Sequence, residues 1–365
     1  MPCRKNYHPK GDIMEIEQIL HQAIDCGASD IFVVAGLPLT FKVQGSQQRL
    51  EDRERMTPAG TERFAREVYA VAGRTPLCLE GGQTDDDFSF SLSGVGRFRV
   101  NLFRQRGSIA AVVRVIRFAL PTAEEANIPP EVMRVAMLKK GIVLVSGQAG
   151  SGKSTTLACL IDEINHTRSG HILTLEDPVE YIHRHDKCIV SQREIHTDCP
   201  SYVTALRSAL RESPDVILLG EMRDRETMEV AMTAAETGQL LFSSLHTTGA
   251  ANTIDRIIDA FPPNQQAQVR LQLSMVLQSV ISQQLVPDVD NNLIPVFEIM
   301  HMNLAIRNMI RESKTHQLES VMASCAGQGM RTMDMALLKL YQEKRITKET
   351  LLTYCTNLEA MQKRI

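Results

Sequence analysis

Residues 142–155 read IVLVSGQAGSGKST, an apolar run followed by a glycine-rich turn. Residues 147–154 match the pattern G-x-x-x-x-G-K-[ST] in full, and the helical run TTLACLI follows. A strand, a glycine loop and a helix form the context in which backbone N–H groups and a helix N-terminus bind phosphate. We expect Lys153 to reach the β- and γ-phosphates of ATP and the Ser154 hydroxyl to bind Mg²⁺. The predicted phosphate-binding residues are Gly147, Gln148, Ala149, Gly150, Ser151, Gly152, Lys153, Ser154 and Thr155.

Three further apolar runs are predicted strands that end in polar residues. Glu221 follows the run VILLG, Glu176 follows ILTL, and His246 follows LLFSSL. Because the carboxyl ends of parallel strands meet at the ligand crevice, these side chains are expected near the phosphate loop. We expect Glu221 to orient or deprotonate the attacking water, Glu176 to share the work around Mg²⁺ and that water, and His246 to sense the γ-phosphate. The structural alternatives are a solvated strand end, a turn at Asp177-Pro178, and a structural histidine.

Gly220 departs from the usual acidic strand of phosphate-loop ATPases. A typical sequence has Asp at the position that Gly220 holds here, next to Glu221. The expected Mg²⁺ site therefore depends on Ser154 and on contacts through water.

Arginines gather on the two predicted strands that end the N-terminal part of the chain. They are Arg97, Arg99, Arg104, Arg106, Arg114 and Arg117. Phosphoryl transfer commonly uses an arginine, often supplied by a neighbouring subunit, to neutralise charge in the transition state. Arg99 and Arg114 are predicted to act in this way across a subunit boundary, because their strands lie in a part of the chain without its own phosphate loop. The alternative is a solvated arginine surface.

Residues 1–118 are predicted to form a small α+β domain. Apolar and polar residues alternate on both sides of the turn at residues 93–96, which predicts a β-hairpin. Residues 119–131 contain several prolines and acidic residues and are interpreted as a linker. The expected elements are helices over 13–26 and 58–72 and strands over 31–34, 41–43, 88–92, 97–103 and 109–118.

Beyond the linker, buried strand patterns alternate with helical ones, as in a parallel sheet that helices cover on both faces. From residue 264 the chain is predicted to be helical, and the apolar positions from Leu273 to Leu285 are interpreted as one face of a core helix. The predicted fold class is α/β, with an ATPase core over 132–290 and a helical C-terminal region over 291–365. The predicted strands are 142–146, 172–175, 216–220 and 240–244.

The composition excludes several classes of protein. A net charge of −3 and a pI near 6.4 give no global attraction to nucleic acid, and none is expected as a partner. None of the eight cysteines forms a C-x-x-C pair, so no zinc site is predicted. The N-terminus lacks an apolar signal segment, and no apolar run approaches the roughly 18 residues that span a bilayer. A cytoplasmic protein is expected, and any membrane association would be peripheral.

These motifs, in this order, resemble the secretion ATPase superfamily, which powers type II secretion, type IV secretion and type IV pili. The resemblance rests on the phosphate loop, the acidic stretch 172–181, the stretch 206–224 and the Leu-His-Thr box at 245–247, and it covers nearly the whole chain. It implies a PAS-like N-terminal domain, a RecA-like ATPase domain, ATP with Mg²⁺, and a homohexamer with ATP between subunits. It also implies partners, namely a polytopic inner-membrane platform protein of the pilus machine and other pilus motor ATPases. The ring would then lie at the inner face of the cytoplasmic membrane.

Within this superfamily the chain is most similar to the pilus-retraction subfamily. Residues 305–312, Ala-Ile-Arg-Asn-Met-Ile-Arg-Glu, are close to a motif of that subfamily. Arg307 and Arg311 lie four residues apart and therefore share one helix face. The resemblance implies that they couple hydrolysis to retraction, whereas the pattern alone fits an amphipathic helix with two solvated arginines. Gln239 and Ser213 depart from the family pattern, which usually has His and Asp at these positions.

The expected function is that of a hexameric motor ATPase for pilus retraction. An accessory retraction paralogue and a motor for secretion or DNA uptake are alternatives within the same superfamily. A nucleic-acid translocase is disfavoured by the acidic pI and the lack of a recognisable nucleic-acid module. A non-hydrolysing assembly module is disfavoured because both Lys153 and Glu221 are present.

Overall fold

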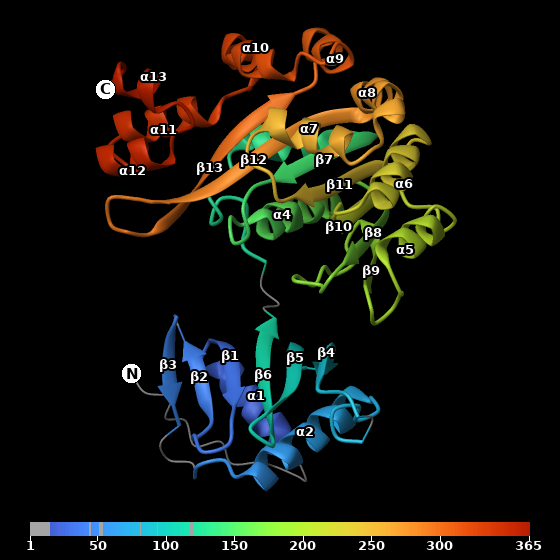
Figure 1. Cartoon of the computed structure of the whole chain (residues 1–365), viewed down its shortest axis with the longest axis vertical. Helices are drawn as coiled ribbons and strands as arrows, with labels where there is room; N and C mark the ends of the chain where they lie inside the picture. Colours follow the sequence, from blue (N-terminus) through green and yellow to red (C-terminus); the bar gives the residue numbers. More distant parts are fainter. Residues whose placement is uncertain (1–14, 44, 51–53, 81, 93, 117–119) are drawn as a thin grey trace. The chain divides into compact units, whose positions relative to one another are not determined.

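The computed structural model describes residues 15–43, 45–50, 54–80, 82–92, 94–116 and 120–365. The chain forms two compact units that divide between Ala119 and Leu120. Figure 1 shows the elements of each unit.

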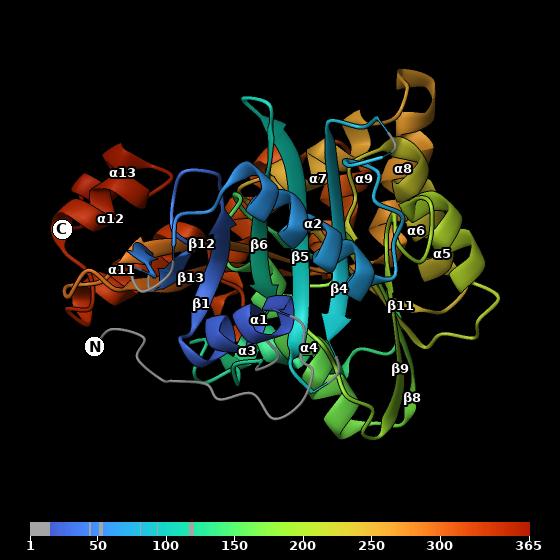
Figure 2. The ribbon, with the colours of Figure 1, turned by 90° about the horizontal axis from the view of Figure 1, so that it is seen from below.

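The first unit is an antiparallel sheet with two helices on one face (Figure 2). The strand order is β3-β2-β1-β6-β5-β4. Its strands are β1 (Ala28–Val33), β2 (Thr40–Val43), β3 (Ser46–Arg49), β4 (Asp85–Leu92), β5 (Gly96–Gln105) and β6 (Ser108–Ile116). Its helices are α1 (Glu15–Asp25) and α2 (Pro58–Ala72).

The alternation seen in the sequence decides which side of this sheet is buried. Along β5, Phe98 and Val100 point into the core, while Arg97 and Arg99 lie on the opposite, partly exposed face. The predicted hairpin is confirmed, since β4 pairs antiparallel with β5. Strand β3 was not predicted, because its four residues are all polar and exposed and give no apolar signal.

The second unit is a mixed, mostly parallel sheet in the order β13-β12-β7-β11-β10-β8-β9. All of its neighbouring strands run parallel except the antiparallel pair of β12 and β13. The predicted α/β fold class is therefore confirmed. The strands are β7 (Gly141–Ser146), β8 (Gly170–Glu176), β9 (Cys188–Glu194), β10 (Val216–Glu221), β11 (Leu240–Leu245), β12 (Leu277–Pro287) and β13 (Leu293–His301).

Helices cover both faces of this sheet, so successive residues of one strand enter different cores. Ile142 and Leu144 of β7 belong to the core beneath α5 to α10, while Val143 and Val145 belong to the core beneath α3 and α4. The helices are α3 (Pro130–Met133), α4 (Lys153–Thr167), α5 (Tyr202–Ala209), α6 (Arg225–Glu236), α7 (Ala250–Asp259), α8 (Pro263–Val276), α9 (Leu304–Arg311), α10 (Leu318–Ser324), α11 (Met333–Gln342), α12 (Lys348–Tyr354) and α13 (Leu358–Gln362).

The prediction of one core helix through residues 273–285 is wrong. Helix α8 ends at Val276, and the chain continues directly as strand β12, which pairs with β7 and β13. Because β12 is buried on both faces, it lacks the alternation of a half-exposed strand. Its buried polar residues Ser279, Ser282 and Gln283 leave the apolar ones at helical spacing, so the pattern indicated a helix. The region 291–365, expected to be helical, likewise begins with strand β13.

A buried carboxylate ties the C-terminal helices to the sheet. Glu298 on β13 accepts hydrogen bonds from the backbone N–H of Ala250 at 2.6 Å and of Met333 at 3.2 Å, at the starts of α7 and α11. Burial raises the pKa of Glu298, and the hydrogen bonds from the two helix N-termini oppose that change. Within the described ranges, no helix is both long and apolar enough to cross a bilayer.

Candidate active site

The phosphate loop bends sharply because two of its glycines lie against strand β12. Gly147 and Gly152 have positive φ angles of 146° and 87°. A Cβ atom on Gly147 would lie 2.1 Å from the carbonyl oxygen of Gln283, and one on Gly152 would lie 2.9 Å from Gln283 Nε2. Gln283 Oε1 also accepts a 2.7 Å hydrogen bond from the Thr156 hydroxyl. The close approach of this buried glutamine therefore favours glycine at both loop positions.

Lys153 begins helix α4, and its ammonium group turns back over the loop. Its Nζ donates to the carbonyl oxygens of Gly147 and Gln148, both at 2.8 Å. Burial lowers the pKa of Lys153, and the nearby carboxylates of Glu221 and Glu180 oppose that change. The cation lies where phosphate oxygens meet backbone N–H groups in loops of this kind.

The strand-end residues meet the phosphate loop around a cavity of about 410 Å³. Glu221 ends β10, and its side chain is only 11% exposed. Its Oε1 lies 2.6 Å from a terminal nitrogen of Arg223. Its Oε2 is buried and has no hydrogen-bond partner within the described residues. One carboxylate oxygen is therefore free to accept a proton or a hydrogen bond from a molecule in the cavity.

His246 lies between the lysine and the glutamate. Its Nδ1 is 3.5 Å from Lys153 Nζ, and its Nε2 is 3.3 Å from Glu221 Oε2, although this second contact lacks hydrogen-bond geometry. An ammonium group can only donate, so a hydrogen bond between these two groups uses Nδ1 as the acceptor. The histidine thus links the phosphate-binding cation to the carboxylate at the end of β10.

The carboxyl group of Glu176, at the end of β8, has a raised pKa. Burial raises its pKa to about 7, against weaker opposing hydrogen bonds. The side-chain amide of Gln192 donates to Glu176 Oε1 at 3.4 Å. A carboxyl with a pKa near 7 can exchange a proton near neutral pH, as an active-site acid or base does.

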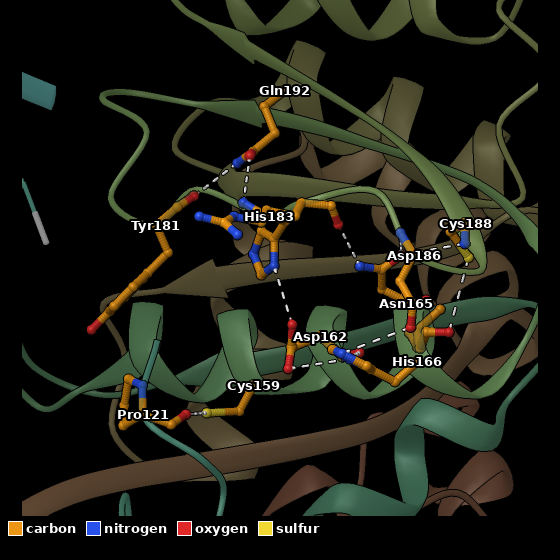
Figure 3. Close-up of polar contacts among 12 residues, drawn as sticks. Pro121, Cys159, Asp162, Asn165, His166, Tyr181, His183, Asp186, Cys188 and Gln192 are labelled. Carbon is orange, nitrogen blue, oxygen red and sulfur yellow. Dashed lines mark hydrogen bonds and ion pairs between the residues drawn. The ribbon is translucent and has the colours of Figure 1, made fainter. Parts of the chain in front are cut away.

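The segment between β8 and β9 is held by hydrogen bonds to Gln192 and Asn165 (Figure 3). Its residues Tyr181 and His183 line the cavity. Gln192 donates to the Tyr181 carbonyl at 2.9 Å and accepts from the His183 N–H at 2.8 Å. On the other side, Asn165 of α4 donates to the carbonyl oxygen of Arg184 at 2.7 Å. The segment is therefore fixed to β9 and to the helix that follows the phosphate loop.

The structure brings most of the predicted catalytic residues together. The cavity lining includes Glu176, Glu221 and His246 beside the phosphate loop. The described residues contain no group of three or more His, Cys, Asp or Glu side chains arranged to hold a metal ion. A cation at Ser154 would therefore depend on phosphate oxygens and water as well.

Arg99 and Arg114, the arginines predicted to act across a subunit boundary, are neighbours on one face of their sheet, whereas Arg117 lies outside the described residues. Arg99 and Arg114 are directly paired across β5 and β6. Arg99 forms a two-point ion pair with Asp87, at 3.0 and 2.8 Å. Arg114 has one contact with Asp30 at 3.2 Å and remains 68% exposed. Arg114 is thus the more available of the two for a further anionic partner.

Arg307 and Arg311 lie outside the cavity and contact the end of helix α8. Arg307 donates to the carbonyl oxygens of Ser274 and Met275, and Arg311 donates to the Ser274 hydroxyl at 3.0 Å. Both cations therefore occupy the favourable, negative end of the α8 dipole. Both side chains are hydrogen-bonded to α8, although Arg311 remains exposed to solvent.

Sequence reasoning missed two residues of this site. Gln283 lies in the stretch interpreted as helical, and because four other polar residues lie between 277 and 287, nothing in the sequence marked it. Tyr202 lines the cavity from the start of α5, and no motif marked it.

Comparisons with known proteins agree with this geometry. Residues 10–345 match the family described as type II/IV secretion system protein. The chain is 44% identical to "Type IV pilus retractation ATPase PilT" of Pseudomonas aeruginosa over 336 residues, which cover 92% of this chain and 96% of that protein. It is 48% identical to "Twitching motility protein" of Neisseria gonorrhoeae over 276 residues, which cover 75% of this chain and 74% of that protein.

A solved structure shares the whole architecture. The crystal structure of the pilus retraction motor PilT with bound ADP superposes with a TM-score of 0.88 at 44% identity, over 96% of this chain and 100% of that one. The chain accordingly belongs to the type II/IV secretion system protein family and is a PilT-like, nucleotide-binding ATPase within it.

Proposed function

We propose that this chain is a motor subunit that couples ATP hydrolysis to retraction of a type IV pilus. The cavity in which the phosphate loop meets Glu221 carries the proposal. The 44% identity to the retraction ATPase of P. aeruginosa, over 92% of the chain, supports pilus retraction as the work performed.

The residues divide the hydrolytic step between them. Lys153 holds the β- and γ-phosphates, and the water oxygen attacks the γ-phosphorus. Glu221 Oε2 accepts a proton from that water as the bond from the γ-phosphorus to the bridging oxygen breaks, which yields ADP and phosphate. His246 lies between Lys153 and Glu221. It would therefore transmit the presence of phosphate at Lys153 to the carboxylate of Glu221.

The residues present fit a magnesium ion. Ser154 is half-buried in the first turn of α4 and lines the cavity, and the unpartnered Glu221 oxygen can hold a water molecule of the ion's shell. When bound, Mg²⁺ would neutralise charge on the β- and γ-phosphates. Ser154 would hold it directly, while Glu176 and Glu221 would contact it through water.

A ring of six subunits would place Arg99 or Arg114 of one subunit at the nucleotide of its neighbour. The neighbouring arginines on β5 and β6 support this, with Arg114 favoured by its exposure and its single ion-pair contact. The ring would act at the inner face of the cytoplasmic membrane, against a polytopic platform protein and beside other pilus motor ATPases.

Arg307 and Arg311 would couple hydrolysis to retraction through the elements that they hold. They fix the end of α8, which continues directly into β12, and β12 carries Gln283 against the phosphate loop. A change in the loop on hydrolysis would thus move β12 and the α8–α9 contact together.

A deletion strain tests the proposal. Loss of the gene is expected to abolish twitching motility and to leave pili extended, and the wild-type chain should restore retraction while Lys153→Ala should not. Normal retraction in the deletion strain would contradict the proposal and favour an accessory, secretion or DNA-uptake motor.

A further inference from the structure

The space beside Gly220 is filled by the hydroxyl of Tyr202. A Cβ atom on Gly220 would lie 2.9 Å from Tyr202 Oη and 3.3 Å from the Leu175 carbonyl oxygen. At this place, one residue before Glu221, the usual acidic strand carries an aspartate side chain. The phenol of Tyr202, from helix α5, thus lies where a side chain at position 220 of β10 would begin.

The backbone around Tyr202 holds its ring in a defined place. Tyr202 is the first residue of α5, and the Ser201 side chain caps the helix by accepting from the Thr204 N–H at 3.3 Å. The half-buried ring packs against the core of the second unit. The residue lines the cavity together with Glu176, Asp177 and Glu221.

The Tyr202 hydroxyl keeps its proton in these surroundings. Burial raises its pKa, and the nearby carboxylates of Glu221, Asp177 and Glu176 raise it further. A neutral phenol donates one hydrogen bond and also accepts. The hydroxyl forms no hydrogen bond with any residue in the described part of the chain, so both capacities are available to a molecule in the cavity.

We propose that the Tyr202 hydroxyl is the second protein contact of the water that Glu221 activates, and so a further catalytic residue. The inference rests on the proposed function of Glu221. One proton of the water points to Glu221 Oε2, and the other points to Tyr202 Oη, which accepts it. The water oxygen is left with a lone pair toward the γ-phosphorus. During attack the proton passes to Glu221, and the phenol is unchanged at the end of the step.

The hydroxyl oxygen of Tyr202 distinguishes a role in holding water from a role in packing. Phenylalanine would fill the same space in the core, so a packing role needs the ring alone. A water-holding role needs the oxygen. Tyr202→Phe removes that oxygen and leaves the ring.

The test is a cycle of variants in the full-length chain: Tyr202→Phe, Gly220→Ala, their combination, Glu221→Gln and, as a matched control, Tyr341→Phe on helix α11. The measurements are kcat and KM for ATP, the affinity for a fluorescent ADP analogue, and the assembly state. Tyr202→Phe should lower kcat roughly 10- to 100-fold, the loss expected when a reacting group is displaced. KM and ADP affinity should stay within about threefold, since the contact forms with water and not with the nucleotide.

Gly220→Ala should cause a similar loss, because its Cβ displaces the hydroxyl. The combined variant should be no slower than Tyr202→Phe alone, because the atom that the Cβ displaces is then absent. Tyr341→Phe should behave as the wild type does.

The outcomes separate this inference from the proposed function. Tyr202→Phe with kcat within twofold of wild type, while Glu221→Gln is inactive, would overturn the role of Tyr202 alone. A fall in ADP affinity that matches the fall in kcat/KM would overturn it in favour of nucleotide binding. Full turnover by Glu221→Gln would overturn the assigned base and this inference with it.

Discussion

The nucleotide cavity and the α8–α9 contact both hold charged side chains, yet their hydrogen bonding differs. In the cavity, Glu221 Oε2 and Ser151 Oγ are buried without a partner among the described residues, and the pKa of Glu176 is raised to about 7. At the α8–α9 contact, Arg307 and Arg311 are bonded to the last turn of α8. Buried polar groups normally find partners, so exceptions mark places that a ligand completes. The cavity therefore resembles a reaction site. The α8–α9 contact instead holds two helices together.

Removing the central cation of the cavity should have the largest effect. Lys153→Ala is expected to lower ATP turnover by at least about 100-fold and to weaken nucleotide binding, because the phosphates lose their main positive partner. Steady-state hydrolysis and nucleotide titration measure both. The control is Lys339→Ala, an exposed lysine on α11. Near wild-type turnover in Lys153→Ala would place the reaction site elsewhere.

Disrupting the α8–α9 contact should uncouple ATP hydrolysis from pilus retraction. Arg307→Ala combined with Arg311→Ala is expected to abolish retraction in cells while ATP turnover stays within about threefold of wild type. The variant should unfold with about 1–3 kcal/mol less stability, because hydrogen bonds from cations to a helix end are lost. Retraction frequency, turnover and chemical unfolding give the three readouts.

Two comparisons make that result specific. Lys314→Ala, on an exposed lysine paired with Glu312, should retract normally. Replacing both arginines by lysine should recover part of the stability. Normal retraction by the double alanine variant would mean that α9 is structural and that coupling occurs at another surface.

Mixed rings test whether the cavity is complete within one subunit. Lys153→Ala and Arg114→Ala subunits, each inactive alone, should regain about a quarter of the wild-type rate when mixed equally, because one in four interfaces then combines an intact lysine with an intact arginine from the neighbour. Arg99→Ala should give a smaller defect, since Asp87 already neutralises that side chain. Proven mixing without any regain would place the arginine in the same subunit as its lysine or make it structural.

The expected effect that leaves turnover and retraction aside is a dependence of stability on pH. Folded Glu176 keeps a proton up to a pKa of about 7, whereas the unfolded chain loses it near the ordinary value of 4.5. A raised pKa gives stability that is present below the unfolded value and is lost as pH rises through the folded one. Between pH 5 and pH 8 the wild type should therefore lose up to about 3 kcal/mol more stability than Glu176→Gln. Parallel pH curves in chemical unfolding would show that Glu176 is ionised in the free protein.

The sequence predicted the residues of the nucleotide cavity better than it predicted the α8–α9 contact. The reason is that short, continuous stretches of sequence determine the cavity residues. The phosphate loop and Glu221 are each set by a short run, a strand followed by one turn, so their neighbourhood follows from the rule for parallel strand ends. Strand β9 was missed because Cys188–Glu194 carries mostly polar, partly exposed residues and has no clear alternation. In β12 several polar residues are buried, so its apolar residues fall at helical spacing and the periodicity indicated a helix.

The partners of the α8–α9 contact could not be predicted from the spacing of residues along the sequence. Arg307 and Arg311 share a face by their separation, but the partner of that face, the end of α8, depends on α8 stopping at Val276. The same applies to Gln283, whose role is defined by two glycines more than 130 residues earlier in the chain. Tertiary contacts of this kind need the fold itself.

Retraction by the Glu221→Gln chain tests the central claim most directly. In a deletion strain that expresses this variant at wild-type levels, pilus retraction events are counted while ATP turnover is measured on the same purified chain. The account predicts a chain that assembles and binds ATP, shows almost no turnover and gives no retraction. Retraction at the wild-type frequency by the Glu221→Gln chain would contradict it.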